Sequence, residues 1–204
     1  LFNEAVAISA SATINAAAGY GLLGFASTSG TVQTIESGGK TLPGLTFNGA
    51  GSSYRLSDAS VSNGTVTLLR GTFDTNSMAC SWDAFTTTGA LARSLLLGTS
   101  QVTVASAGTA WHAALTGLTM VAGGSTITVS HAESPTCSGG GATYGTVVFA
   151  EAGTPVIAGA GTTFANLTRT GTPVQTDALA LAADIVVTGT LGLTGQSIVN
   201  RILF

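Results

Sequence analysis

The sequence predicts an all-β protein, and within that class a β-solenoid of the parallel β-helix type. Thr, Ser and Gly supply 33, 20 and 28 of the 204 residues, whereas charged residues make up only 7%, far below the roughly 25% of an ordinary domain. Short β-branched or aromatic runs alternate with clusters of Gly, Ser, Asn and Asp, which is the pattern of strands separated by turns. A similar unit, a turn residue followed by a short run of apolar residues and Thr, returns along the chain.

The returning unit sets the expected size of one solenoid coil. It begins at Gly44, Gly64, Ser94, Gly117, Gly145 and Gly189. Returns of about 20–30 residues are typical of a chain in which each repeat forms one coil stacked on the last. About 25 residues per coil and about 4.8 Å per coil predict about eight coils and a rod of about 40 Å. The unequal steps predict loops at some corners, and a β-sandwich is the alternative architecture.

The individual strands are expected where apolar residues alternate with hydroxyl-bearing ones, so that one side of each strand is apolar. Only two stretches, Ala10–Ala18 and Asp177–Ala183, are rich in Ala and Leu, and both are shorter than an isolated helix requires. The expected strands are Thr31–Ile35, Gly44–Phe47, Tyr54–Leu56, Gly64–Leu69, Ser94–Leu97, Gln101–Val104, Gly117–Met120, Ser125–Val129, Gly145–Phe149, Thr162–Leu167 and Asp184–Leu193.

Composition and charge exclude several classes of protein. The net charge is −3 with only six Lys and Arg residues, too few basic groups to neutralise a phosphate backbone, so we expect no nucleic-acid partner. No apolar run reaches the roughly 18 residues of a membrane span. Apolar residues make up 45% of the chain, which argues against disorder.

The two cysteines, Cys80 and Cys137, lie far apart in the sequence. They form a candidate disulfide if the protein works outside a reducing cytosol. The favoured interpretation is two half-buried thiols that behave as small hydrophobic residues. Zinc binding is not expected, because no further Cys or His stands at the spacing of a zinc site.

Five carboxylates are candidates for the paired acids of a glycoside hydrolase, which lie about 5–10 Å apart. Two of them would meet only if they occupied one side of adjacent coils. Asp58 and Asp74 are interpreted instead as turn residues that bind their own backbone. The five residues are Asp58, Asp74, Asp83, Glu133 and Glu151. With no Gly-x-Ser-x-Gly motif either, the sequence predicts a protein that is not an enzyme and has no catalytic, cofactor-binding or metal-binding residues.

Histidines, Thr-x-Thr units and aromatic residues are the remaining candidates for a binding site. His112 and His131 stand without a partner at metal-ligand spacing. The units Thr65-Val66-Thr67 and Thr126-Ile127-Thr128 are widely separated in the chain, whereas an ice-binding array needs such units in register on successive coils. Aromatic residues inside a solenoid belong to the core more often than to a sugar-stacking surface, and this applies to Tyr54, Trp82, Trp111 and Tyr144.

Much of the chain resembles a family of β-strand-repeat proteins found among bacteriophage minor tail and virion structural proteins. The runs that carry the resemblance are GTFDTNSMACSWDAFTTTGALARSLLLGTSQVTV, GLTMVAGGSTITVS, SGGGATYGTVVF and TFANLTRTGT. The ending ADIVVTGTLGLTGQSIVNRILF is similar to the close of that repeat block. The resemblance covers about residues 45–204, expected to form a solenoid that continues beyond 204, and leaves residues 1–44 as an N-terminal capping or interface segment.

This resemblance implies a non-enzymatic structural component of a virion, such as a tail fibre, spike or surface decoration, with an extracellular location. The alternatives are a carbohydrate-binding or depolymerising spike, and a bacterial surface adhesin or filament subunit. The expected partners are other virion proteins, further copies of the chain, and a host surface glycan. Copies are expected to associate because the ends of a solenoid expose strand edges, and a homotrimer is favoured by analogy with fibres and spikes.

Overall fold

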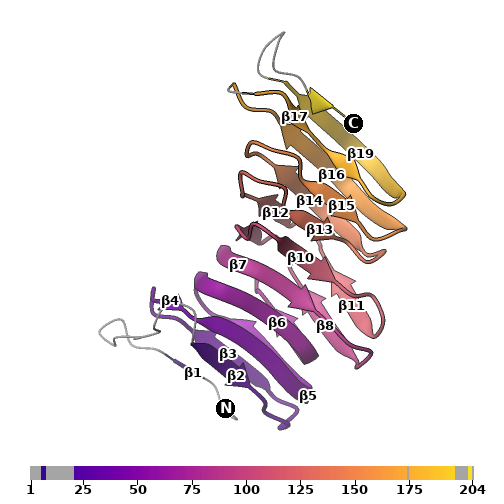
Figure 1. Cartoon of the computed structure of the whole chain (residues 1–204). Coiled ribbons are helices and arrows are strands. Elements are labelled where there is room, and N and C mark those ends of the chain that lie inside the picture. The colour runs from indigo at the N-terminus through magenta and orange to yellow at the C-terminus, as the bar shows by residue number, and fades with distance from the viewer. Residues whose placement is uncertain (1–5, 8–20, 174, 196–201, 204) are drawn as a thin grey trace.

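The computed structural model is all-β, and its strands run parallel and stack into a rod (Figure 1). The structure describes residues 6–7, 21–173, 175–195 and 202–203, and no helix occurs among them. The strands are β1 (Val6–Ala7), β2 (Leu22–Phe25), β3 (Val32–Glu36), β4 (Thr41–Leu42), β5 (Gly44–Leu56), β6 (Ser60–Asp74), β7 (Cys80–Thr87), β8 (Arg93–Leu96), β9 (Gln101–Val104), β10 (Thr109–Ala113), β11 (Leu118–Val121), β12 (Thr126–Val129), β13 (Thr136–Ser138), β14 (Thr143–Phe149), β15 (Val156–Ala158), β16 (Thr162–Thr170), β17 (Asp177–Ala178), β18 (Ala180–Leu181), β19 (Ile185–Thr194) and β20 (Ile202–Leu203).

Each coil of the rod contributes strand segments to three faces, called A, B and C in chain order. Face A stacks β2, the start of β5, the middle of β6, the end of β7, β10, β13, β15 and β18. Face B holds β3, the ends of β5 and β6, β8, β11 and the starts of β14, β16 and β19. Face C holds β4, the starts of β6 and β7, β9, β12 and the ends of β14, β16 and β19. The eight segments of face A define coils 1 to 8, which confirms the predicted solenoid and excludes the sandwich.

The register corrects the repeat that the sequence suggested. The residues aligned with one another along face A are Leu23, Leu45, Val66, Phe85, Trp111, Cys137, Ile157 and Leu181. The steps between them are unequal, and the two longest run from Phe85 to Trp111 and from Trp111 to Cys137. The units beginning at Gly44 and Gly64 lead into face A, those at Ser94 and Gly117 into face B, and those at Gly145 and Gly189 into face C. All three faces need a corner residue followed by an alternating strand, so the same local pattern recurs on each.

A ladder of buried aromatic rings runs along the inside of the rod. Adjacent ring centroids are 4.3 to 6.3 Å apart, close to the roughly 4.5–7 Å of favourable aromatic pairs. The ladder consists of Phe25, Phe47, Phe73, Trp82, Phe85, Trp111, Tyr144 and Phe164. Tyr54 packs beside it against Phe25 and Phe47, and all of these side chains are at most 1% exposed. The expectation that Tyr54, Trp82, Trp111 and Tyr144 belong to the core is confirmed.

The loops predicted from the unequal steps gather at one corner. The two longest steps arise because residues 105–108 and 130–135 lie between the end of face C and the start of face A. Residues 150–155 form the next loop at this C–A corner. The A–B and B–C corners are mostly tight turns, and in β14, β16 and β19 the strand passes from face B to face C without a break.

The first 44 residues contain described structure only in part. Residues 22–42 form coil 1 through β2, β3 and β4, which pair with β5 and β6 of coil 2. A capping or interface role for the residues before 21 falls outside the described part, except for β1, which pairs with β3. That role stays a prediction.

Candidate interaction surfaces

Two of the five candidate carboxylates hold turns together at the B–C corner. Asp58 accepts hydrogen bonds from the backbone N of Ser37 (2.8 Å), Ser37 Oγ (2.7 Å) and the backbone N of Gly38 (2.8 Å). Asp74 accepts one from the backbone N of Asn76 (2.8 Å) and pairs with Arg55 Nε at 2.8 Å. Asp74 therefore caps its own turn as predicted, whereas Asp58 caps the turn of the coil before it.

Burial opposes ionisation of Asp58, but the hydrogen bonds from Ser37 and Gly38 outweigh it, so its pKa lies below the ordinary value. We expect Asp58→Ala to lower the free energy of unfolding at pH 7 by about 1–3 kcal/mol, as for hydrogen bonds to a charged group. Because the folded-state pKa of Asp58 is lowered, the difference in the free energy of unfolding between wild type and Asp58→Ala is complete above about pH 4. It is lost as the pH falls further. Urea unfolding at several pH values measures it, with exposed Asp83→Ala as the control. An equal loss in both variants would contradict this role for Asp58.

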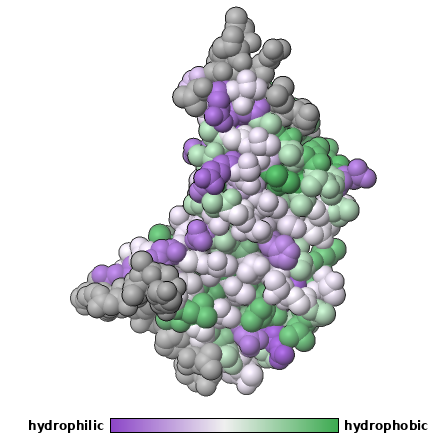
Figure 2. Space-filling model, in the orientation of Figure 1, coloured by the Kyte–Doolittle hydropathy of each residue, from purple (hydrophilic) through white to green (hydrophobic). Residues whose placement is uncertain are grey.

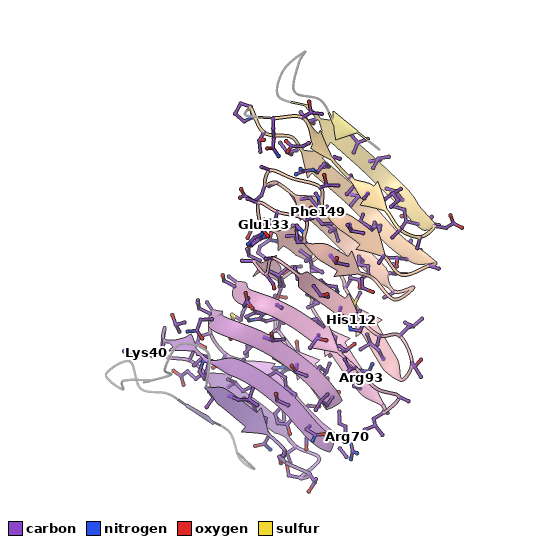
Figure 3. The ribbon with its side chains drawn as sticks, in the orientation of Figure 1. Lys40, Arg70, Arg93, His112, Glu133 and Phe149 are labelled. Atoms are coloured by element: carbon purple, nitrogen blue, oxygen red, sulfur yellow. The ribbon has the colours of Figure 1, made fainter. Side chains whose placement is uncertain are left out.

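The other three carboxylates are exposed at the C–A corner. Asp83 follows coil 3, while Glu133 and Glu151 lie in the loops that follow coils 5 and 6. Figure 3 shows Glu133 at the left edge of the rod, away from Arg93 and His112 on the right. The structure therefore separates the five carboxylates into two corners. Asp58 and Asp74 lie in consecutive coils at the B–C corner, and Glu133 and Glu151 lie in consecutive loops at the C–A corner.

Neither histidine belongs to a metal site in the described part of the chain. His112 points outward from face A, with Nδ1 3.4 Å from Thr86 Oγ1. His131 Nδ1 accepts a hydrogen bond from the backbone N of Glu133 at 3.2 Å. Over residues 21–173 and 175–195, no group of three or more His, Cys, Asp or Glu side chains could hold a metal ion.

The thiols of Cys80 and Cys137 are free and buried. Cys80 lies on face C of coil 3 and Cys137 on face A of coil 6, so three coil rises of about 4.8 Å separate them. A disulfide requires Cα atoms within about 7 Å. Burial raises the pKa of each thiol to about 12, which leaves both protonated and poorly nucleophilic at neutral pH.

We expect Ellman's reagent to modify neither thiol in the native protein and both after unfolding in urea without reductant. The native part follows from burial, because the reagent needs an accessible thiolate. The reaction of the unfolded protein distinguishes free thiols from a disulfide, since a disulfide-bonded pair would not react with the reagent in urea. Modification of either thiol in the native state would contradict the buried positions.

The outward residues of face C in coils 4 to 8 carry no charge. Thr126 and Thr128 lie on this face, whereas Thr65 and Thr67 lie on face A, so the two Thr-x-Thr units do not share a surface, as their spacing predicted. One outward column holds Gln101, Thr126, Thr146, Asn166 and Thr190, and the next holds Thr103, Thr128, Val148, Thr168 and Gly192. Asn166 links its column, since Nδ2 donates to Thr146 Oγ1 (3.3 Å) and Oδ1 accepts from the backbone N of Thr190 (3.0 Å).

Two small hollows lie on the described part of the surface. One of about 260 Å³ lies on coils 2 to 4 of face C, lined by Ala59, Ser60, Val61, Ala79, Cys80, Ser81, Gln101 and Thr103. Another of about 200 Å³ lies at the A–B corner, lined by Gly51, Ser52, Gly71, Thr72, Ala92, Arg93 and Ser94. Both are smaller than the roughly 300–1,000 Å³ of typical ligand pockets. Figure 2 shows one side of the molecule, with mostly intermediate hydropathy and both hydrophilic and hydrophobic residues scattered over it.

Two buried arginines, which sequence reasoning missed, tie neighbouring coils together. The Arg93 guanidinium donates to the backbone carbonyls of Gly89, Leu91, Ala114 and Thr116 at 2.7–3.0 Å, which joins the A–B corners of coils 4 and 5. Arg169 does the same at the C–A corner. The sequence does hold a signal for both arginines in the alternation of inward and outward positions along a strand. Arg93 alternates with Leu95 and Leu97, and Arg169 with Leu167, so both occupy inward positions.

No protein-family model, curated protein or solved structure matches this chain. The described residues also include no helix that is long and apolar enough to cross a membrane. What defines the class of this protein is therefore its architecture, a three-faced parallel β-solenoid with weakly charged surfaces.

Proposed function

We propose that this chain is a non-enzymatic structural element, a stiff rod segment in an extracellular assembly. The proposal rests on what four charged side chains of the rod bind. Asp58, Arg93, Arg169 and Asp177 bind the backbone of neighbouring coils or corner loops and do not converge on a cleft. Together with the aromatic ladder, these contacts favour a rod that resists bending and proteolysis.

We further propose that the assembly is a bacteriophage virion, with the chain in a tail fibre, spike or surface decoration. This rests on the resemblance of residues 45–204 to β-strand-repeat virion proteins. Immunogold electron microscopy, with antibodies against the purified chain, tests it on phage particles and cells from the source culture. Label on particles supports the virion assignment. Label confined to the cell surface would instead favour a bacterial adhesin or filament subunit.

The proposed partners are other virion proteins and further copies of the chain, with a homotrimer as the favoured assembly by analogy with fibres and spikes. Multi-angle light scattering of the purified chain over a hundred-fold concentration range tests self-association. A constant mass of three chains supports the trimer. A stable monomer throughout the range would overturn it.

A glycan-binding or depolymerising spike is the second candidate. Loops inserted on one side of a repeat protein often form its binding face, and here they gather at the C–A corner with Glu133 and Glu151 in consecutive coils. Incubation with host surface polysaccharide distinguishes the candidates. Release of reducing ends that Glu133→Gln or Glu151→Gln abolishes would establish a depolymerase, and saturable binding without release would indicate attachment only.

A further inference from the structure

An arginine occupies a core position near the C-terminal end of the rod. On face C, Arg169 is in register between Phe149 of the coil before and Leu193 of the coil after. The same column holds Val104 and Val129 in coils 4 and 5. Arg169 is completely buried, although a buried charge is costly unless it is paired and hydrogen-bonded.

The Arg169 guanidinium is surrounded by backbone carbonyls of the corners on either side of it. Nε donates to Ala178 O at 3.1 Å, and Nη2 donates to Gly153 O at 2.8 Å. The acceptors of Nη1 are the carbonyl oxygens of Phe149, Glu151 and Thr170. One side chain therefore joins the loop after coil 6 to β17.

Asp177 completes this cluster from the opposite side. Its Oδ1 is 3.5 Å from Arg169 Nη2, and Asp177 is 1% exposed. The carboxylate accepts hydrogen bonds from the backbone N of Gly153 (2.9 Å), the backbone N and Oγ1 of Thr172 (2.5 and 2.9 Å) and Gln175 Nε2 (3.2 Å). Burial opposes ionisation, but these hydrogen bonds outweigh it and lower the pKa of Asp177, so the carboxylate is charged at neutral pH.

Asp177 is also the first residue of β17, the strand that receives β20. Asp177 and Ala178 pair in parallel with Ile202 and Leu203, and the backbone N of Ala178 donates to Gly153 O at 3.2 Å. β17 is thus fixed on one side to the loop after coil 6 and bonded on the other side to β20. Figure 1 places β17 at the end of the rod, beside the last coil.

We propose that Arg169 and Asp177 form a conformational clasp that controls whether β17 stays docked on the rod and paired with β20. With the clasp closed, β17 is held on the loop that contains Gly153 and offers its edge to β20. With the clasp open, β17 and β20 separate from the rod while coils 2 to 5 stay folded, because a solenoid coil contacts only its neighbours. The clasp also accounts for the buried Arg169–Asp177 ion pair, because two apolar side chains could fill the same space without loss of stability.

Hydrogen-exchange mass spectrometry on the full chain tests the clasp. We expect Asp177→Asn to accelerate exchange at least about ten-fold in the peptides that contain β17 and β20, with coils 2 to 5 unchanged, as for local opening. Asp184→Asn, at an exposed position in the same coil, is the matched control and should exchange like wild type. No acceleration in Asp177→Asn, or equal acceleration along the whole rod, would overturn the proposal.

The double variant Arg169→Leu/Asp177→Asn separates the clasp from a general contribution to stability. Leu restores the apolar column of face C and removes the unpaired charge, so the melting temperature should rise above that of Asp177→Asn. The peptides with β17 and β20 should nevertheless remain at least about ten-fold faster in exchange, because the link to Gly153 and Ala178 is gone. Wild-type protection of those peptides in the double variant would show that the pair is not a clasp.

Discussion

Gly140→Ala is expected to cause one of the largest losses of stability that a single methyl group can produce in this protein. Gly140 lies at the A–B corner between β13 and β14 with φ +60°, where a residue with a Cβ costs about 1–2 kcal/mol in strain. A Cβ there would overlap the carbonyl oxygen of Ala113 and lie 2.9 Å from its carbonyl carbon. Since both atoms belong to the backbone of the preceding coil, the coils must separate locally.

We expect the strain and the separation of the coils together to lower the free energy of unfolding by about 3–5 kcal/mol. For a chain of this length that corresponds to a melting temperature lower by about 6–20 °C, measured by circular dichroism. Gly161→Ala is the matched control, because Gly161 lies at the same corner one coil later, has φ +75°, and has nothing within 4 Å of its virtual Cβ. Gly161→Ala should therefore lose only the stability that corresponds to the backbone strain, about 1–2 kcal/mol. If the two variants lost equal stability, the close approach to Ala113 would not be the cause.

The fold class could be predicted from sequence because its cause is local. Alternation of apolar and hydroxyl-bearing residues in runs such as Gln101–Val104 produces a strand with one buried side, and β9 has these same bounds. Strands missed by the prediction, such as β10 and β13, contain Ala, His or Cys at several positions, so their apolar pattern is weaker. The number of coils followed from the length of the repeat and the length of the chain.

The register could not be predicted, because the three faces present similar sequences. The unit GTVTL at Gly64 and the unit GTVVF at Gly145 look alike as sequences, yet they lead into faces A and C. Only long-range pairing decides which face a strand joins. The loops at the C–A corner shift the register further, since they lengthen two of the coils without altering the strands beside them.

The clasp could not be predicted for a related reason. The partners of Arg169 are mostly backbone carbonyls, such as those of Gly153 and Ala178, and any sequence supplies carbonyls. The sequence does hold one signal, a charged residue in phase with buried Leu167, but phase alone does not reveal what surrounds it. Asp177 stands in a stretch rich in Ala and Leu, and only the fold brings it to Arg169.

Trp111→Ala is expected to have a comparable effect and to change the cooperativity of unfolding as well. Trp111 lies in coil 5, midway along the aromatic ladder, with its ring 4.4 Å from Phe85 and 6.3 Å from Tyr144. Its Nε1 donates to Tyr144 Oη at 3.0 Å. Removing so large a buried side chain costs about 3–5 kcal/mol. In a solenoid whose stability is transmitted between neighbouring coils, a cavity at coil 5 also weakens the link between coils 1–4 and coils 6–8.

We therefore expect wild type to unfold in one transition and Trp111→Ala to unfold in two, or in one that is markedly broader, by differential scanning calorimetry. Phe25→Ala is the control, because Phe25 is equally buried but lies in coil 1 at the end of the ladder, where no coils are divided. Trp111→Phe keeps an aromatic ring and loses the hydrogen bond to Tyr144, which is worth about 1 kcal/mol, so it should unfold in one transition at a lower temperature. A single sharp transition in Trp111→Ala would mean that the strand ladders of the three faces, rather than the aromatic ladder, make the rod cooperative.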